Sequence, residues 1–288
     1  MPPYVTLSLD EVKQVARATV NTLKSLDLDS CLVGSMACSA YGMSRVPNVR
    51  SYITLPCQLR QHSFLHKDID LVVLTNSRSS EEIKNLLVST NSNFFLVPSK
   101  DRYATYKVLW YSLTSVRPSY YARACKVDIL LPGIMNIPSI PTQSIIYRAT
   151  LPLMPFLPLL LLKLQAWVDH GTSTKEYLKA KTWVDVRDLT ELLNLNSTTD
   201  RGKLRGLSSL PDTFVRTAKS HVARYVEMYP QSASLWKEVG FEDLMLNSRH
   251  GTSGLLSPRI RIASGSYANS SDRFFRYGSG AGRPLKRW

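Results

Sequence analysis

Two short apolar segments that carry isolated aspartates constrain this fold more than any other feature of the chain. Segment 68–74 begins with Asp68-Ile-Asp70, and segment 127–131 has Asp128 among Val, Ile and Leu. Residues two apart in a strand share a face of the sheet, so Asp68 and Asp70 are expected to point the same way. Their apolar neighbours are typical of buried strands. A carboxylate inside such a strand costs free energy unless it is paired or bound to a metal.

The three aspartates are therefore predicted to hold divalent cations. Oxygen ligands suit Mg²⁺, and two ions held together suit in-line displacement at phosphorus, so we expect two Mg²⁺ ions, with Mn²⁺ as a substitute. The residues alone leave two alternatives open. Asp68 and Asp70 could begin a solvated edge strand. Asp128 could be a buried, hydrogen-bonded acid without a ligand.

A Gly-Ser pair, Gly34-Ser35, follows a third short apolar segment and precedes a run with helical character. Backbone N–H groups at the start of a helix favour anions, so this turn is a candidate site for the phosphates of a nucleoside triphosphate. The simpler interpretation is a strand-to-helix turn in which Ser35 caps the helix.

The ordered set of Gly34-Ser35, Asp68-x-Asp70 and Asp128 resembles the nucleotidyltransferase superfamily, whose fold is shared by DNA polymerase beta. Residues 31–42 and Arg45 are similar to the small, single-chain branch that includes the AbiEii-like enzymes of toxin–antitoxin systems and fungal relatives, and the resemblance covers about residues 10 to 195. It implies an α/β (α+β) fold with a mixed sheet, flanking helices and a helical C-terminal domain. It also implies metal-dependent transfer of a nucleoside monophosphate from an NTP to a hydroxyl acceptor, which the sequence does not identify.

The resemblance implies further site residues in the second half of the chain. In AbiEii-like enzymes a lysine on the first helix after the catalytic domain contacts the nucleotide phosphates, and Lys163 matches its place. Asp185 and Asp188 match a Lys/Arg-Asp-x-x-Asp pattern whose acids help to place the active-site helix, so they are candidate nucleotide-binding residues. Their spacing puts both on one face of a helix. The alternatives are a surface lysine with a solvated head and an amphipathic helix with solvated acids.

We expect a catalytic domain at residues 1–135 and a linker at 136–154. A helical domain at 155–246 and a disordered basic tail at 247–288 are expected to follow. The linker is expected because six of the sixteen prolines fall between 132 and 158. From Arg249 onward the chain has eight Lys or Arg residues and one acidic residue, so the tail carries half of the net charge of +14. Its Gly, Ser and aromatic residues predict disorder, with RNA binding or a protein partner as candidate functions.

One departure from the family pattern is the length between its first two motifs. Asp68 lies 33 positions after Ser35, and the surplus maps onto residues 49–67. We interpret this segment as an insertion or a retained intron; a genuine surface loop is the alternative, because long insertions cost little. Since the segment precedes Asp68, a second function stays open: a nucleotidyltransferase-like domain that binds nucleotide or RNA without turnover.

Other features exclude whole classes of protein. No apolar run approaches the length of a membrane span, and acidic and basic residues interrupt any apolar core at the N-terminus. The four cysteines show no metal-ligand spacing. We therefore expect an intracellular protein, cytoplasmic or nuclear, with reduced thiols and no membrane partner.

Overall fold

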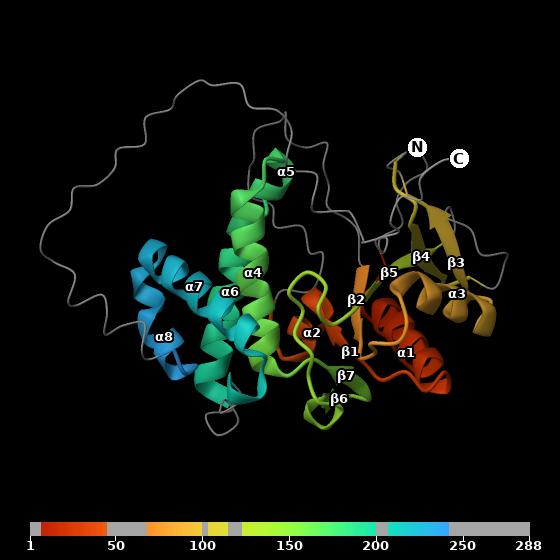
Figure 1. Ribbon diagram of the computed structural model, residues 1–288, viewed down its shortest axis with the longest axis horizontal. Coiled ribbons are helices and arrows are strands. Elements are labelled where there is room, and N and C mark those ends of the chain that lie inside the picture. Colours follow the sequence, from red (N-terminus) through yellow and green to blue (C-terminus); the bar gives the residue numbers. More distant parts are fainter. Residues whose placement is uncertain (1–6, 45–67, 100–102, 115–122, 200–206, 242–288) are drawn as a thin grey trace, which may run out of the picture.

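The computed structural model describes residues 7–44, 68–99, 103–114, 123–199 and 207–241. A mixed sheet with helices on both faces forms one half of the molecule, and a group of helices forms the other (Figure 1). This arrangement confirms the predicted α/β fold with a helical second half. Segment 49–67 and the basic tail 247–288 lie outside the described residues, so the interpretations placed on them stay predictions.

The sheet has seven strands in the order β3-β4-β5-β2-β1-β7-β6. Central β2 runs antiparallel to β1 and parallel to β5. The strands are β1 Ser30–Val33, β2 Asp68–Val73, β3 Phe94–Pro98, β4 Lys107–Ser112, β5 Ala124–Leu130, β6 Ile146–Arg148 and β7 Leu151–Leu153. Because β2 is paired on both sides, the alternative of a solvated edge strand for Asp68 and Asp70 is wrong.

Two helices that pack against the sheet begin with capping boxes. Ser8 caps α1 with Glu11, and Ser79 caps α3 with Glu82, as the spacing of Ser79 and Glu82 predicts. The helices of the first half are α1 Leu9–Ser25, α2 Gly34–Ala40 and α3 Ser80–Thr90. Those of the second half are α4 Phe156–Thr172, α5 Glu176–Lys179, α6 Thr182–Thr199, α7 Asp212–Met228 and α8 Ala233–Glu238.

The proline-rich segment 136–154 differs from the linker expected of it, because it contains β6 and β7. Strand β7 runs parallel to β1, with Leu153 opposite Leu32, and the amide of Met154 donates to the Leu32 carbonyl at 2.9 Å. Leu153 and Met154 are fully buried. The apolar residues between the prolines therefore extend the sheet toward α4.

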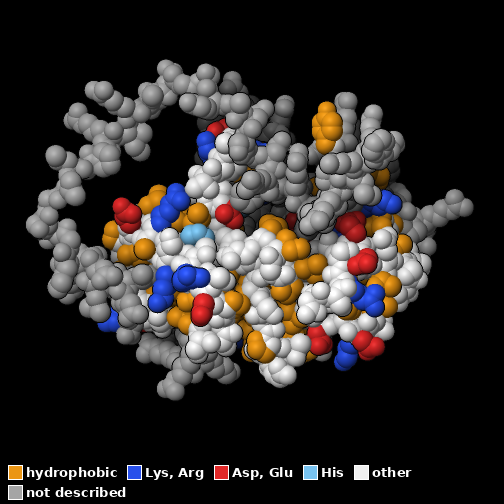
Figure 2. Space-filling view, viewed as in Figure 1, with side chains coloured by type: hydrophobic (Ala, Val, Ile, Leu, Met, Phe, Trp, Pro, Cys, Tyr) orange, Lys and Arg blue, Asp and Glu red, His pale blue; other side chains and the backbone are white. Residues whose placement is uncertain are grey.

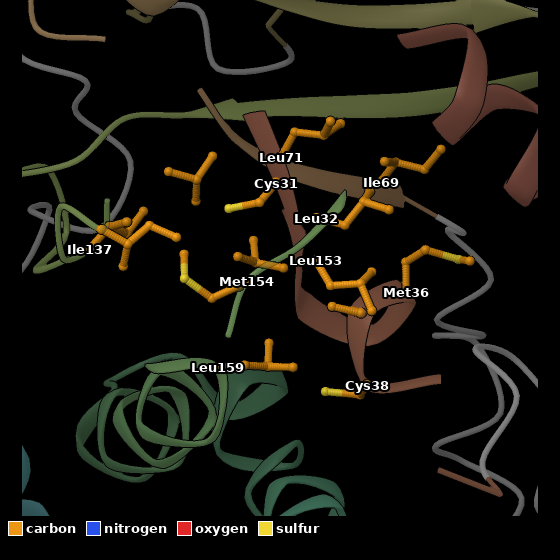
Figure 3. Packing of buried hydrophobic residues seen from close by; sticks show 14 of the residues in the cluster. Cys31, Leu32, Met36, Cys38, Ile69, Leu71, Ile137, Leu153, Met154 and Leu159 are labelled. Carbon is orange, nitrogen blue, oxygen red and sulfur yellow. The ribbon is translucent and has the colours of Figure 1, made fainter. Parts of the chain in front are cut away.

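One continuous core joins the sheet to the helical half. Figure 3 shows buried side chains from β1, α2, β7 and α4, among them Leu32, Met36, Leu153 and Leu159. Further along α4, Trp167 packs edge-on against Tyr225 of α7. Burial of each such side chain contributes roughly 1.5–3 kcal/mol. Helix α4 is thus fixed to both halves, and residues on its inner face have defined positions near the sheet.

The surface carries both charged and apolar side chains. In the view of Figure 2, hydrophobic side chains gather over the region between the two halves. Ile134, Met135 and Tyr147, which precede β7, are exposed hydrophobic residues. Within the described ranges, no helix combines the length and the apolar character that a membrane span requires.

Candidate metal centre

Asp68, Asp70 and Asp128 gather on one face of the sheet, near its centre. In the register of β2 and β5, Asp70 lies opposite Asp128 and Asp68 lies opposite Lys126. Each of the three acids offers a carboxylate oxygen, and these oxygens lie within 4.8 Å of one another. All three residues are half-buried. Such a set of oxygen ligands can hold a divalent cation. Asp128 is half-buried and accepts a hydrogen bond from Lys126, so the alternative of a hydrogen-bonded acid without a ligand stays open.

The crowding of three carboxylates has an electrostatic cost. Burial raises the pKa of Asp70 well above its usual range, and the charges of Asp68 and Asp128 raise it further. Burial also raises the pKa of Asp68, although the ammonium groups of Lys126 and Lys181 offset part of this effect. A divalent cation would relieve both the repulsion and the desolvation, so the residues present fit a metal ion.

Gly34 lies directly against Asp70. It begins α2 with a φ of +64°, a backbone conformation that residues with a side chain rarely adopt. A Cβ atom at this position would lie 2.2 Å from Oδ2 of Asp70, far inside any non-bonded contact distance. Two independent features, the backbone angle and the close approach, therefore require glycine here. The Gly-Ser turn and the acidic residues form one site, although they are far apart in sequence.

Ser35 is half-buried in the first turn of α2. The N-cap of this helix is Val33, and no side chain of the described residues caps it. The interpretation of Ser35 as a capping residue is therefore wrong. The start of α2 lies beside the Asp70 carboxylate through Gly34. The role of Ser35 in nucleotide binding stays a prediction.

Lys126 is a member of the site that the sequence analysis missed. Its Nζ atom lies 2.5 Å from Oδ2 of Asp128. Burial lowers the pKa of Lys126, but Asp128 and the other two acids raise it by more, so the ammonium form is favoured. A signal was present in the sequence: Lys126 and Asp128 are two residues apart in one strand and must share a face.

Lys163 of α4 lies between the acidic cluster and α6. Its Nζ donates to Oδ2 of Asp188 at 3.0 Å, and the two side chains are only 15% and 1% exposed. The alternative of a solvated surface lysine is therefore wrong. Burial is the main cause of the raised pKa of Asp70, and the positive charge of Lys163 offsets part of this increase. The structure thus brings Lys163 near Asp70. The contact of Lys163 with nucleotide phosphates stays a prediction.

Asp185 and Asp188 both face α4, so the alternative of solvated acids on an amphipathic helix is wrong. Oδ2 of Asp185 lies 2.6 Å from Nδ1 of His170, and both aspartates are buried. Together with the Lys163–Asp188 pair, this contact joins α4 to α6 at two points. His170 was also missed by the sequence analysis, although it lies seven residues after Lys163 and hence on the same helical face. Whether Asp185 and Asp188 act on nucleotide stays a prediction.

No protein-family model and no curated protein matches this chain. Among solved structures, it is similar to the crystal structure of an antigenic nucleotidyltransferase-like protein from Paracoccidioides brasiliensis, with a TM-score of 0.54 and 19% sequence identity. The match covers 81% of this chain and 95% of that chain. A likeness at this identity concerns the fold, and the AbiEii-like branch stays a prediction. The chain thus has a nucleotidyltransferase-like fold, with an acidic cluster that can bind metal at the centre of its sheet.

Proposed function

We propose that this chain is a Mg²⁺-dependent nucleotidyltransferase that transfers a nucleoside monophosphate from an NTP to a hydroxyl group. The observation that carries the proposal is the convergence of three carboxylates, with oxygens within 4.8 Å of one another, beside Gly34 in a nucleotidyltransferase-like fold. Three acids on two neighbouring strands suit phosphoryl chemistry, because they can fix metal ions on both sides of a reacting phosphorus atom.

In this proposal Asp68, Asp70 and Asp128 hold two Mg²⁺ ions. When bound, the ions supply positive charge to the triphosphate and lower the pKa of the acceptor hydroxyl. Asp128 lies nearest the acceptor and accepts the hydroxyl proton. The acceptor oxygen forms a bond to the α-phosphorus while the bond to the bridging oxygen breaks, and pyrophosphate leaves. Catalysis is then mainly a matter of position and charge.

The remaining residues position the phosphates and the helices. N–H groups at Gly34 and Ser35 donate to the β and γ phosphates of the NTP. Lys163, which lies close to Asp70, contributes positive charge as pyrophosphate leaves. Asp188 orients the Lys163 ammonium through their 3.0 Å contact, and Asp185 holds α6 to α4 through His170. Lys163 thus acts from a fixed position rather than as a mobile surface charge.

The four-part organisation of the chain remains part of the proposal, with one change. Residues 1–135 and 155–246 are proposed as the catalytic and helical domains, and 247–288 as a basic tail. Segment 136–154, however, adds β6 and β7 to the sheet and so continues the catalytic domain.

The acceptor is proposed to be RNA, a protein hydroxyl or a small molecule. The net charge of +14 favours RNA, since phosphates are attracted by an excess of Lys and Arg. The basic tail is the candidate segment for this contact. Under the same proposal the protein acts in the cytoplasm or the nucleus, where NTPs and RNA are present.

A second candidate is a domain that binds nucleotide without turnover. The observation in its favour is the 2.5 Å contact between Lys126 and Asp128, which engages one of the three carboxylates in an ion pair. Such a domain would show nucleotide binding that depends on divalent cations, without release of pyrophosphate.

The test is a transfer assay with each of the four NTPs labelled at the α-phosphate, Mg²⁺, and either total RNA or total protein. We expect the wild-type chain to label either the RNA or the protein. The label should be absent when EDTA is added or when the Asp70→Asn variant replaces the wild type. The same assay on a chain without residues 49–67 tests whether that segment limits activity. Nucleotide binding without label transfer and without pyrophosphate release would support the second candidate instead.

A further inference from the structure

We propose that Lys126 is an internal counter-ion that competes with divalent cations for Asp128, and that it thereby sets the metal affinity of the centre. The inference rests on the proposed function, because it assumes that the three carboxylates bind metal. The observation that supports the inference is the ion pair between Lys126 and Asp128, whose Nζ and Oδ2 atoms are 2.5 Å apart.

The position of Lys126 follows from the strand geometry. Lys126 and Asp128 are two residues apart in β5, and Lys126 lies opposite Asp68 of β2 in the parallel register. Its side chain therefore extends over the same face of the sheet as all three acids. Both partners of the ion pair are partly shielded from water, with 30% of the Lys126 side chain exposed. The contact is thus more than a surface ion pair, the kind that usually contributes little.

Two further ammonium groups act on the cluster, Lys163 on Asp70 and Lys181 on Asp68. Lys163 is held by Asp188 at 3.0 Å, so part of its charge is neutralised by a carboxylate outside the cluster. Lys126 forms an ion pair with Asp128, one of the three aspartates. The lysine consequently neutralises part of the negative charge of the cluster in the metal-free protein.

A metal ion cannot use Asp128 freely while this contact persists. Mg²⁺ binds carboxylate oxygens at about 2.0–2.1 Å, and an ammonium group on the same oxygen occupies a lone pair and repels the incoming ion. The four-carbon stem of lysine is flexible, so Lys126 can withdraw without a change in the strand. Metal binding at Asp128 is therefore an exchange of an ammonium group for a divalent cation. The need to displace Lys126 weakens the affinity for metal, while the ammonium group reduces the repulsion between the three carboxylates in the metal-free protein.

The test is a calorimetric titration of the full chain with Mn²⁺ in the absence of nucleotide. Lys126→Met removes the charge but keeps an unbranched side chain, and we expect it to bind Mn²⁺ at least about tenfold more tightly than wild type. Lys126→Arg keeps the charge and can still pair with Asp128, so it should bind Mn²⁺ no more tightly than wild type. Lys237→Met removes the same charge from an exposed position on α8 and should stay within about twofold of wild type.

The outcomes separate the inference from the function on which it rests. If wild type binds Mn²⁺ and Lys126→Met binds it equally or more weakly, competition is refuted and Lys126 supports the site in another way. If neither protein binds Mn²⁺, the metal centre itself is refuted, and the inference falls with it. Near-ultraviolet circular dichroism checks the fold of each variant, and Lys126→Gln replaces the Met variant if the latter does not fold.

Discussion

Replacement of Gly34 by Ala should disable the metal centre without altering any carboxylate. The added Cβ would lie 2.2 Å from Oδ2 and 3.1 Å from Cγ of Asp70. Ordinary contacts between such atoms require about 3.5 Å, so either the Asp70 carboxylate or the start of α2 must shift by about 1 Å. A displacement of that size at a reacting centre costs about a hundredfold in rate. Metal binding and nucleotidyl transfer should therefore both be lost.

The effect on stability has two parts. A left-handed backbone conformation costs a residue with a side chain about 1–2 kcal/mol, and overpacking against Asp70 adds about 1–3 kcal/mol. Gly133 is a matched control, because its φ is +79° and an added Cβ would meet no heavy atom of the described residues within 4 Å. Gly133→Ala therefore reports the backbone part alone. The free energy of unfolding should fall by about 2–5 kcal/mol in Gly34→Ala and by about 1–2 kcal/mol in Gly133→Ala.

Urea denaturation measures the two stabilities, and calorimetry with Mn²⁺ measures the two metal affinities. We expect Gly133→Ala to bind Mn²⁺ like wild type, and Gly34→Ala to lose at least about a hundredfold in affinity. Wild-type Mn²⁺ affinity in Gly34→Ala would show that the glycine does not abut Asp70 and would refute the reasoning.

Three further predictions concern the charged residues. Asp70→Asn should lower Mg²⁺-dependent transfer by at least about a hundredfold while circular dichroism shows unchanged helical content; retained activity would remove Asp70 from the site. Because burial raises the pKa of Asp70 well above its usual value of 3.8, the folded chain retains a proton that the unfolded chain has released. The Tm of the metal-free protein should thus decline as the pH rises from 4 to 8, and less so in Asp70→Asn; equal slopes would contradict this. Lys163→Ala should cost about 3–5 kcal/mol in urea denaturation, because it removes the ammonium partner of the buried Asp188 carboxylate, and Lys163→Ala combined with Asp188→Ala should cost less than the two changes added together. Additive effects would mean that the pair is not coupled.

Local periodicity was sufficient to predict the strands that carry the acidic cluster. The alternation in 68–74 and 127–131 placed Asp68, Asp70 and Asp128 on strands, and the structure brings their carboxylates together. Periodicity could not show that these two strands are neighbours; the cost of burying carboxylates without a partner or a metal pointed to it. Gly34 was found as a turn, but its contact with Asp70 depends on the antiparallel pairing of β1 with β2.

Lys126 and His170 had local signals in the sequence, but the other features that were missed depend on pairing across long separations. The burial of Lys163, Asp185 and Asp188 arises from the packing of α4 on α6, and neither helix alone shows which of its polar residues faces the other. Strands β6 and β7 are three residues long and lie in a proline-rich segment, with Pro152 inside β7, so local patterns indicated a linker. They form because β1 offers a free edge to Leu153, which is a tertiary effect.

The central claim is that the three aspartates hold metal ions for a nucleoside triphosphate. It is tested most directly by a crystal structure with Mn²⁺ and a non-hydrolysable NTP analogue, in which anomalous scattering locates the Mn²⁺ ions. We expect Mn²⁺ bound to Asp68, Asp70 and Asp128, with the triphosphate extending toward Gly34 and Ser35. Mn²⁺ absent from these carboxylates, or a nucleotide bound away from them, would contradict it.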